Sequence, residues 1–209
     1  MQLYFNARGV VEAARICYAI KGFTYEDFRY PIDSTTWARP EFDADKAAGK
    51  FVDNMDRLPL LQVGETCIAQ SKAIERFVAK TVGMMGSNDV EAAQIDAIGE
   101  HIRDIKDKYN DAKRGKEGDA LEEAKKVFAT TGLEEWLGKL EKALPGSSGF
   151  AVGSAISLAD VQIFTFSDFF DAKDESKASF AKFSKISASI AAVESAAANW
   201  LATRPVTKI

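Results

Sequence analysis

The sequence predicts an α/β domain in residues 1–82, followed by an all-α domain in residues 88–209. The first range mixes short strand-like runs with helical patterns, in the order β-α-β-loop-β-β-α, whereas beyond residue 88 apolar residues recur at helical spacing. The stretch "GMMGSND" (residues 83–89) contains glycine and is polar at its end, as is typical of a linker. A chain of 209 residues, 46% of them hydrophobic, is long enough for two small domains.

The predicted N-terminal elements are short. Residues 2–5 ("QLYF") form a β-prone run, and residues 9–22 ("GVVEAARICYAIKG") repeat apolar positions at helical spacing between two glycines. A second strand is predicted at residues 23–31 ("FTYEDFRYP"), where aromatic residues alternate with others up to a proline. Residues 33–56 are polar and irregular, which predicts a long loop with room for one short helix.

A predicted hairpin then leads into a helix. Residues 58–63 ("LPLLQV") and 66–69 ("TCIA") flank a Gly-Glu turn, and residues 71–83 form a helical pattern with Ser71 as the expected N-cap. A helix start leaves backbone N–H groups unsatisfied at a positive dipole end, so it can hold a carboxylate. Taken alone, Ser71 is more simply explained as a plain N-cap.

The remaining elements are all predicted to be helices. Apolar residues line one face of residues 95–109, a long amphipathic stretch covers residues 116–144, and a last amphipathic run covers residues 186–200. In residues 157–170, by contrast, apolar side chains surround nearly the whole helix, which indicates a buried helix. Its start fits a capping box of Ser157 with Asp160.

Charge and cysteine content exclude several classes of function. With 27 basic and 31 acidic residues, the chain has no basic excess for nucleic acid or for an anionic membrane surface, and no run is apolar enough to span a bilayer. The two cysteines, Cys17 and Cys67, are interpreted as small buried hydrophobes, which suits a reducing compartment. We therefore expect a cytoplasmic protein with no nucleic-acid or membrane partner.

Motifs for metal or dinucleotide chemistry do not occur in the sequence. It contains no CxxC, HExxH, Walker-type or GxGxxG pattern, and its one histidine, His101, lies in a charged helical run that suggests a surface position. Catalytic groups are therefore sought among tyrosines, carboxylates and helix ends, and no metal site is predicted.

Four blocks in order resemble the cytosolic glutathione S-transferases, and most closely their tyrosine-dependent sigma, mu and pi classes. They are "LYFNARGVVEAAR", "RLPLLQVGETCIAQSKAIERFVA", "DAIGEHIRDIKDKY" and "SLADV". The resemblance extends over the whole chain. It implies a thioredoxin-like N-terminal domain that binds glutathione, an all-α helical-bundle domain with a hydrophobic-substrate site, a homodimer, and glutathione as cosubstrate without any cofactor.

By this resemblance, Tyr4 matches the catalytic tyrosine at the end of the first strand, whose hydroxyl points at the glutathione sulfur. A thiol with an ordinary pKa of about 8.5 is mostly protonated at neutral pH, whereas a phenol, with an ordinary pKa of about 10, can donate a hydrogen bond that favours the thiolate. Without the resemblance, a tyrosine in an apolar strand is more simply explained as a core residue.

The resemblance also assigns the glutathione-binding residues. Leu58-Pro59 matches the turn that pairs with the cysteinyl amide, usually with a cis proline, and Gln70-Ser71 matches the pair that holds the γ-glutamyl carboxylate. Trp37 matches a loop tryptophan near the glycyl end. Asp104 matches an acidic residue that reaches across the dimer interface to the γ-glutamyl ammonium; without the resemblance, it is a solvated carboxylate on a helix face.

Two departures from those classes concern charge near the ligand. Several tyrosine classes have an arginine where this chain has Val10, and Arg8 or Arg15 is a candidate to compensate, although Arg15 resembles a structural position. The loop that follows the tryptophan is longer than in those classes and has no lysine directly after it. Lys46 or Lys50, with Lys50 favoured, or else Arg57, is then expected to bind the glycyl carboxylate.

The sequence thus predicts a glutathione transferase in which the thiolate attacks a small hydrophobic electrophile, with Phe5 and residues 106–111 near the second substrate. Two alternatives remain open. One is a glutathione-dependent isomerase or peroxidase on the same scaffold, and the other is a non-catalytic binding or structural protein.

Overall fold

The computed structural model describes residues 1–146 and 148–207. The chain divides into two compact units, one formed by Met1–Gly83 with the segment from Ala197 onward, and one formed by Met84–Ala196. The predicted domain ranges, 1–82 and 88–209, remain predictions, because a compact unit is not in itself a domain. Residues 147, 208 and 209 of the range 88–209 lie outside the described residues.

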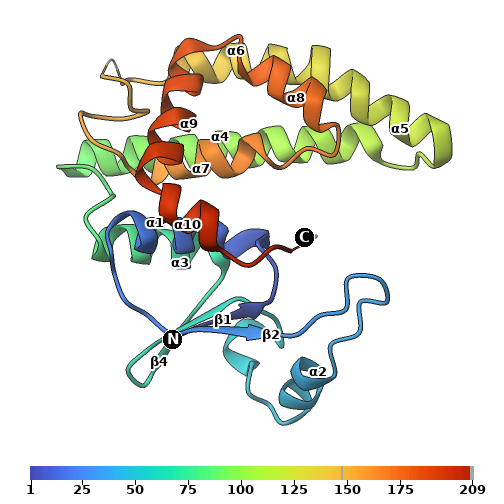
Figure 1. Cartoon of the computed structure of the whole chain (residues 1–209), viewed down its shortest axis with the longest axis vertical. Helices are drawn as coiled ribbons and strands as arrows, with labels where there is room; N and C mark the ends of the chain where they lie inside the picture. The colour runs from blue at the N-terminus through green and yellow to red at the C-terminus, as the bar shows by residue number, and fades with distance from the viewer. Residues whose placement is uncertain (147, 208–209) are drawn as a thin grey trace. The chain divides into compact units, whose positions relative to one another are not determined.

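The segment from Ala197, which the sequence assigned to the helical domain, groups with the first unit. Its helix α10 (Ala198–Thr203) lies beside α1 (Glu12–Ile20) in Figure 1. Trp200 Nε1 and Arg204 Nη1 both donate to Glu12 Oε1, at 3.1 and 2.7 Å. Glu12 is buried, so these two bonds satisfy a carboxylate that burial would otherwise penalise.

The first unit is built on a four-stranded mixed sheet in the order β2-β1-β3-β4. Strand β1 (Gln2–Phe5) pairs in parallel with β2 (Asp27–Tyr30) and antiparallel with β3 (Leu60–Val63), which forms a hairpin with β4 (Thr66–Ala69). Figure 1 shows α1 and α3 (Ser71–Thr81) on one side of the sheet and α2 (Pro40–Ala47) on the other. This is the thioredoxin-like arrangement that was predicted.

Alternation along β1 separates the two faces of the sheet. Leu3 and Phe5 pack against a cluster of Tyr30, Phe42, Phe51 and Leu60, so this face is covered by α2 and the loop after it. Gln2 and Tyr4 must then point to the opposite face, where α1 and α3 lie. The catalytic candidate Tyr4 is therefore on the side of the sheet where α3 begins.

Strand β2 is shorter than predicted. Residues 23–26 are not part of it, because the chain after α1 first forms the C-terminal cap of that helix. Phe23 N donates to Tyr18 O (2.9 Å), and Gly22 has a φ of 62°. This is the hydrogen bonding that a glycine in the left-handed region allows after a helix.

The second unit consists of helices. They are α4 (Asp89–Lys113), α5 (Gly118–Val127), α6 (Leu133–Ala143), α7 (Leu158–Ser167), α8 (Lys173–Phe180) and α9 (Ser184–Ala196). Helix α7 is buried and packs on α4 and α9, and α5 and α6 return along α4 (Figure 1). None of the helices in the described part of the chain is long and apolar enough to cross a membrane.

Two helical predictions need correction. The single stretch over residues 116–144 is divided by a π-helical turn, Phe128–Gly132, where the Ser179 hydroxyl donates to Ala129 O (2.9 Å). The last run is broken at Ala197, between α9 and α10, and α8 was not predicted. By contrast, the capping box at the start of α7 is confirmed, with Asp160 Oδ2 accepting from Ser157 N at 2.8 Å.

Candidate functional site

A pocket of about 150 Å³ opens in the first unit. Three segments line it: the turn before α1, the loop before β3, and the start of α3. Their lining residues are Val10, Asn54, Arg57, Leu58, Pro59, Gln70 and Ser71. All the predicted ligand residues between Arg57 and Ser71 therefore meet at one place, although they come from two segments separated by the β3-β4 hairpin.

The floor of the pocket is the loop that precedes β3. Its Leu58–Pro59 peptide bond is cis, and Pro59 is buried. The Asn54 side chain lies beneath this loop, where its Nδ2 donates to Arg57 O (3.0 Å) and to Pro59 O (2.9 Å). Asn54 was not among the predicted site residues, because residues 33–56 are polar and irregular in sequence. The one available signal was an asparagine shortly before the Leu-Pro pair.

The start of α3 differs from the prediction by one residue. Gln70, and not Ser71, is the N-cap: Gln70 O accepts the first helical bond from Ile74 N (3.0 Å), and Ser71 is the first residue of the helix. Gln70 has a φ of 71°, and its side-chain Nε2 donates to Asn54 Oδ1 (3.3 Å). No side chain in the described residues caps α3. Its first N–H groups thus remain available to an anion beside the Ser71 hydroxyl.

Tyr4 lies next to the pocket but does not line it. Its side chain contacts Gly9: a Cβ built on Gly9 would lie 2.6 Å from the Tyr4 hydroxyl oxygen and 2.8 Å from its Cε1. The neighbouring residue Val10 does line the pocket and is 51% exposed. Among the described residues, no hydrogen bond involves the Tyr4 hydroxyl.

Arg15 holds the loop that follows β1. It is fully buried, its Nη1 donates to Ala7 O (2.5 Å), and its Nε lies 3.1 Å from Asp27 Oδ2. Because these contacts occupy the guanidinium, Arg15 supports the backbone before Gly9. This agrees with the structural role that the resemblance suggested for it.

Besides Tyr4, three of the predicted glutathione-binding residues do not line the pocket. Trp37 is 58% exposed on the loop before α2, and its φ is 60°. Lys50 Nζ pairs with Asp45 Oδ1 (2.7 Å); this pair and the Tyr30 hydroxyl keep the pKa of Asp45 below its usual value. Asp104 is exposed on α4 in the second unit.

The residues predicted near the second substrate have structural contacts of their own. Phe5 packs edge-on to Phe42, with ring centroids 5.0 Å apart. On α4, Lys106 Nζ lies 4.4 Å from the centroid of Phe169, and the Tyr109 hydroxyl donates to Asp171 Oδ2 (2.9 Å). Both contacts join α4 to the residues that follow α7.

The two cysteines differ in exposure. Cys17 is fully buried in α1, and burial together with the nearby Glu75 carboxylate raises the pKa of its thiol. Cys67 is exposed, so the prediction that both are buried is wrong for this residue. The reason is its place on β4, an edge strand of the sheet.

Comparison with known proteins matches both halves of the chain to one family. The glutathione S-transferase N-terminal domain matches residues 2–80, and the C-terminal domain of the same family matches residues 103–204. Two Caenorhabditis elegans proteins, probable glutathione S-transferases 5 and 7, are 30% and 32% identical to the chain, and each alignment covers 98% of this chain and 96% of the relative.

Solved structures agree with these matches. A glutathione S-transferase from the hookworm Necator americanus, described as monomeric, is 29% identical and superposes with a TM-score of 0.79 over 100% of this chain and 98% of its own. A Caenorhabditis elegans glutathione S-transferase is 27% identical, with a TM-score of 0.76 over the same shares.

Proposed function

The chain belongs to the glutathione S-transferase family, and we propose that Tyr4 activates the glutathione thiol for attack on small hydrophobic electrophiles. The observation that carries this proposal is the position of the Tyr4 hydroxyl, which contacts Gly9 directly before the pocket-lining residue Val10. In the reaction, the thiol proton passes to solvent, the sulfur forms a bond to an electrophilic carbon, and the leaving group departs with its bonding electrons. No metal or redox step is required.

The energetic contribution required of Tyr4 is modest. A thiol with an ordinary pKa of about 8.5 is only a few per cent ionised at pH 7. A hydrogen bond to a charged acceptor contributes about 1.5–3 kcal/mol, which corresponds to about one or two pKa units because one unit is about 1.4 kcal/mol. One phenol donor is therefore enough to make the thiolate a major species at neutral pH.

We place the ligand along the pocket by its charges. The α3 start, with its open N–H groups and the Ser71 hydroxyl, is positioned to bind the γ-glutamyl carboxylate, and the backbone at Leu58 to pair with the cysteinyl amide. Arg57 is preferred to Lys50 for the glycyl carboxylate, because Arg57 lines the pocket whereas the Lys50 ammonium is already paired with Asp45. Trp37 remains a candidate contact at the same end.

The test is the ionisation of bound glutathione. Thiolate absorbance in the ultraviolet is measured against pH for the wild type, for Tyr4→Phe, and for a control, Tyr18→Phe, which removes a hydroxyl from a ring that stacks on Tyr25 in the same unit. We expect a bound-thiol pKa below that of free glutathione in the wild type and the control, and an upward shift of one to two units in Tyr4→Phe. The role proposed for Tyr4 is contradicted if the bound thiol has the pKa of free glutathione, or if Tyr4→Phe leaves the pKa of the bound thiol unchanged.

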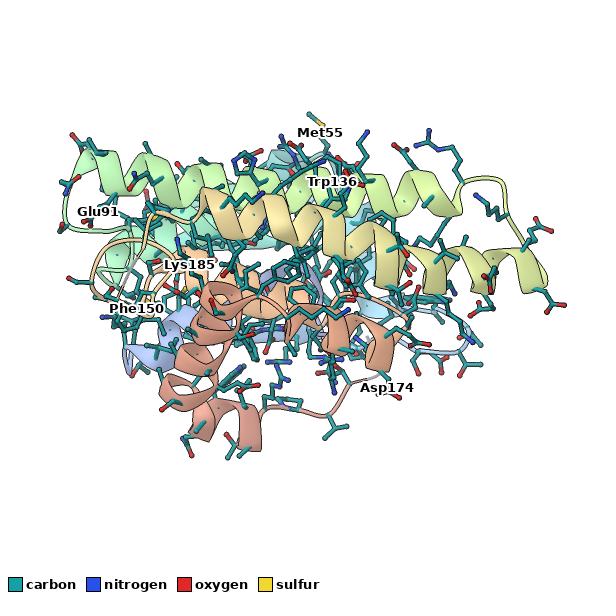
Figure 2. The ribbon with its side chains drawn as sticks, turned by 90° about the horizontal axis from the view of Figure 1, so that it is seen from above. Met55, Glu91, Trp136, Phe150, Asp174 and Lys185 are labelled. Carbon is teal, nitrogen blue, oxygen red and sulfur yellow. The ribbon has the colours of Figure 1, made fainter. Side chains whose placement is uncertain are left out.

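We further propose a homodimer, in which Asp104 of the partner subunit reaches the γ-glutamyl ammonium. Two exposed apolar side chains lie close together on the loop before β3: Val52 is 67% exposed, and Met55 is 78% exposed and projects away from the ribbon in Figure 2, so they offer an apolar surface to a partner subunit. The hookworm relative is described as monomeric, so the oligomeric state of this chain is a point on which the two proteins can differ. Sedimentation at micromolar concentration is expected to give twice the mass of 22.8 kDa, and a monomer would remove Asp104 from the site.

For its cellular role we propose detoxification in the cytoplasm. The two cysteines support a reducing compartment, since both are free in the structure. Comparing conjugation with peroxide reduction and isomerisation, using the same enzyme preparation, would identify the physiological class of second substrate.

A further inference from the structure

The Asn54 side chain connects two of the three segments that line the pocket, the loop before β3 and the start of α3. Asn54 is 3% exposed and lies at the end of a 3-10 turn, Val52–Asn54. Its amide nitrogen donates to Arg57 O and Pro59 O, and its amide oxygen accepts from Gln70 Nε2. One buried amide thus contacts both the loop before β3 and the residue that caps α3.

The partners of Asn54 fix the orientation of two amides. Backbone carbonyls only accept hydrogen bonds, so the Asn54 nitrogen must face Arg57 and Pro59, and its oxygen must face Gln70. Gln70 must then present its nitrogen to Asn54. Within the described residues, the Gln70 amide oxygen accepts no hydrogen bond, which leaves it as an acceptor for an ammonium group at the start of α3.

The backbone above Asn54 needs such support. Met55 and Asp56 have φ values of 50° and 58°, so two successive residues other than glycine occupy the left-handed region, which is unfavourable for both. Arg57 N donates back to Asn54 O (3.1 Å), which closes the turn. The two hydrogen bonds from Asn54 Nδ2, to Arg57 O and Pro59 O, stabilise the end of this strained turn. They thereby fix the backbone at which Leu58 and Pro59 line the pocket.

We propose that Asn54 is a positioning residue that sets the spacing between the γ-glutamyl subsite at Gln70 and the cysteinyl subsite at Leu58. The inference rests on the proposed glutathione binding. A ligand that carries both groups is bound at both subsites only when they are held at the correct separation, so Asn54 acts on affinity for the γ-glutamyl thiol and not on the chemistry at sulfur.

The test is a comparison of Asn54→Ala and Asn54→Asp with the wild type, using glutathione as the varied substrate and a chloronitrobenzene as the electrophile. The aspartate keeps the shape of the side chain and can accept from Gln70, but it cannot donate to the two carbonyls. The matched control is Asp53→Ala, an exposed residue on the same turn. We expect the KM for glutathione to rise about tenfold in both Asn54 variants, because a buried donor pair is lost, while kcat at saturation stays within about twofold.

The KM and kcat values separate positioning from folding. A merely structural role would reduce the amount of active enzyme, and so lower kcat at an unchanged KM; this outcome, or wild-type values for both variants, overturns the inference. Circular dichroism reports whether each variant is folded, and Asn54→Asp serves if Asn54→Ala does not fold. If the wild type itself fails to bind glutathione in equilibrium dialysis, the proposed function is wrong. If the wild type binds glutathione but both Asn54 variants keep the wild-type KM, only the inference about Asn54 is wrong.

Discussion

Replacing Gly9 by alanine should displace the Tyr4 hydroxyl. The new Cβ would lie 2.6 Å from that oxygen and 2.8 Å from Cε1, and real Cβ atoms are not found this close to other heavy atoms. Gly9 also has a φ of 45°, so the substitution carries a backbone cost of about 1–2 kcal/mol. Two effects are therefore expected, a loss of stability and a movement of the Tyr4 hydroxyl.

A matched control separates these effects. Gly22 has a φ of 62°, but a Cβ there would have no neighbour within 4 Å, so Gly22→Ala carries the backbone cost without the contact. We expect both variants to lose about 1–2 kcal/mol of unfolding free energy in urea titrations. Only Gly9→Ala should also lose catalysis, with kcat/KM for a chloronitrobenzene falling about 10- to 100-fold, since a displaced donor loses about 1.5–3 kcal/mol of thiolate stabilisation.

The same substitution in a Tyr4→Phe background provides a second check. If Gly9→Ala acts through the Tyr4 hydroxyl, adding it to Tyr4→Phe should lower kcat/KM by much less than it does in the wild type. A Gly9→Ala enzyme with wild-type kcat/KM and a wild-type pKa for bound glutathione would refute the reasoning, because the contact with Tyr4 would then have no consequence for the thiolate.

Three further predictions follow from charge and exposure. Val10→Arg should place a cation beside the pocket and shift the pH profile of kcat/KM to lower pH, by about one unit if the new charge lies within a few ångströms of the sulfur; an unchanged profile would show that this position does not reach it. Arg57→Ala should raise the KM for glutathione by about tenfold, whereas Lys50→Ala should leave it near the wild-type value. The reverse order would indicate that Lys50, and not Arg57, binds the glycyl carboxylate. Cys67 should react with a disulfide reagent in the native protein and Cys17 only after unfolding, so that two reactive thiols before denaturant is added would contradict the burial of α1.

The elements that the sequence predicted well are those determined by local pattern. Strand β1 and the β3-β4 hairpin follow from apolar runs and a Gly-Glu turn, and the capping box of α7 from Ser157 and Asp160 at the required spacing. The start of α3 was placed one residue late because serine is the better cap by composition. Gln70 takes the cap position through a positive φ and a side-chain bond to Asn54, which no local pattern reveals.

The loop between β2 and β3 could not be interpreted because its structure depends on distant contacts. Phe42 and Phe51 pack on Tyr30 and Leu60 from neighbouring strands, and Asn54 folds the end of the loop around its own side chain. The candidate site divides in the same way. The residues alone suggest the helix start as an anion site, but Tyr4 was proposed only through the family resemblance, because an isolated tyrosine in an apolar strand is usually a core residue.

The distribution of charge around the pocket suggests how binding and activation are separated in this chain. Among the described residues that line the pocket, Arg57 is the only cation, and it lies on the loop before β3. The turn that contacts Tyr4 contributes Val10 instead, and the buried Arg15 is occupied by Ala7 O and Asp27. In the proposed binding mode, positive potential from the α3 start and Arg57 faces the two carboxylates of the ligand, and the sulfur is left to the Tyr4 hydroxyl. Tyr4→Phe should consequently affect thiol ionisation while leaving the affinity for glutathione nearly unchanged, and Arg57→Ala should do the opposite.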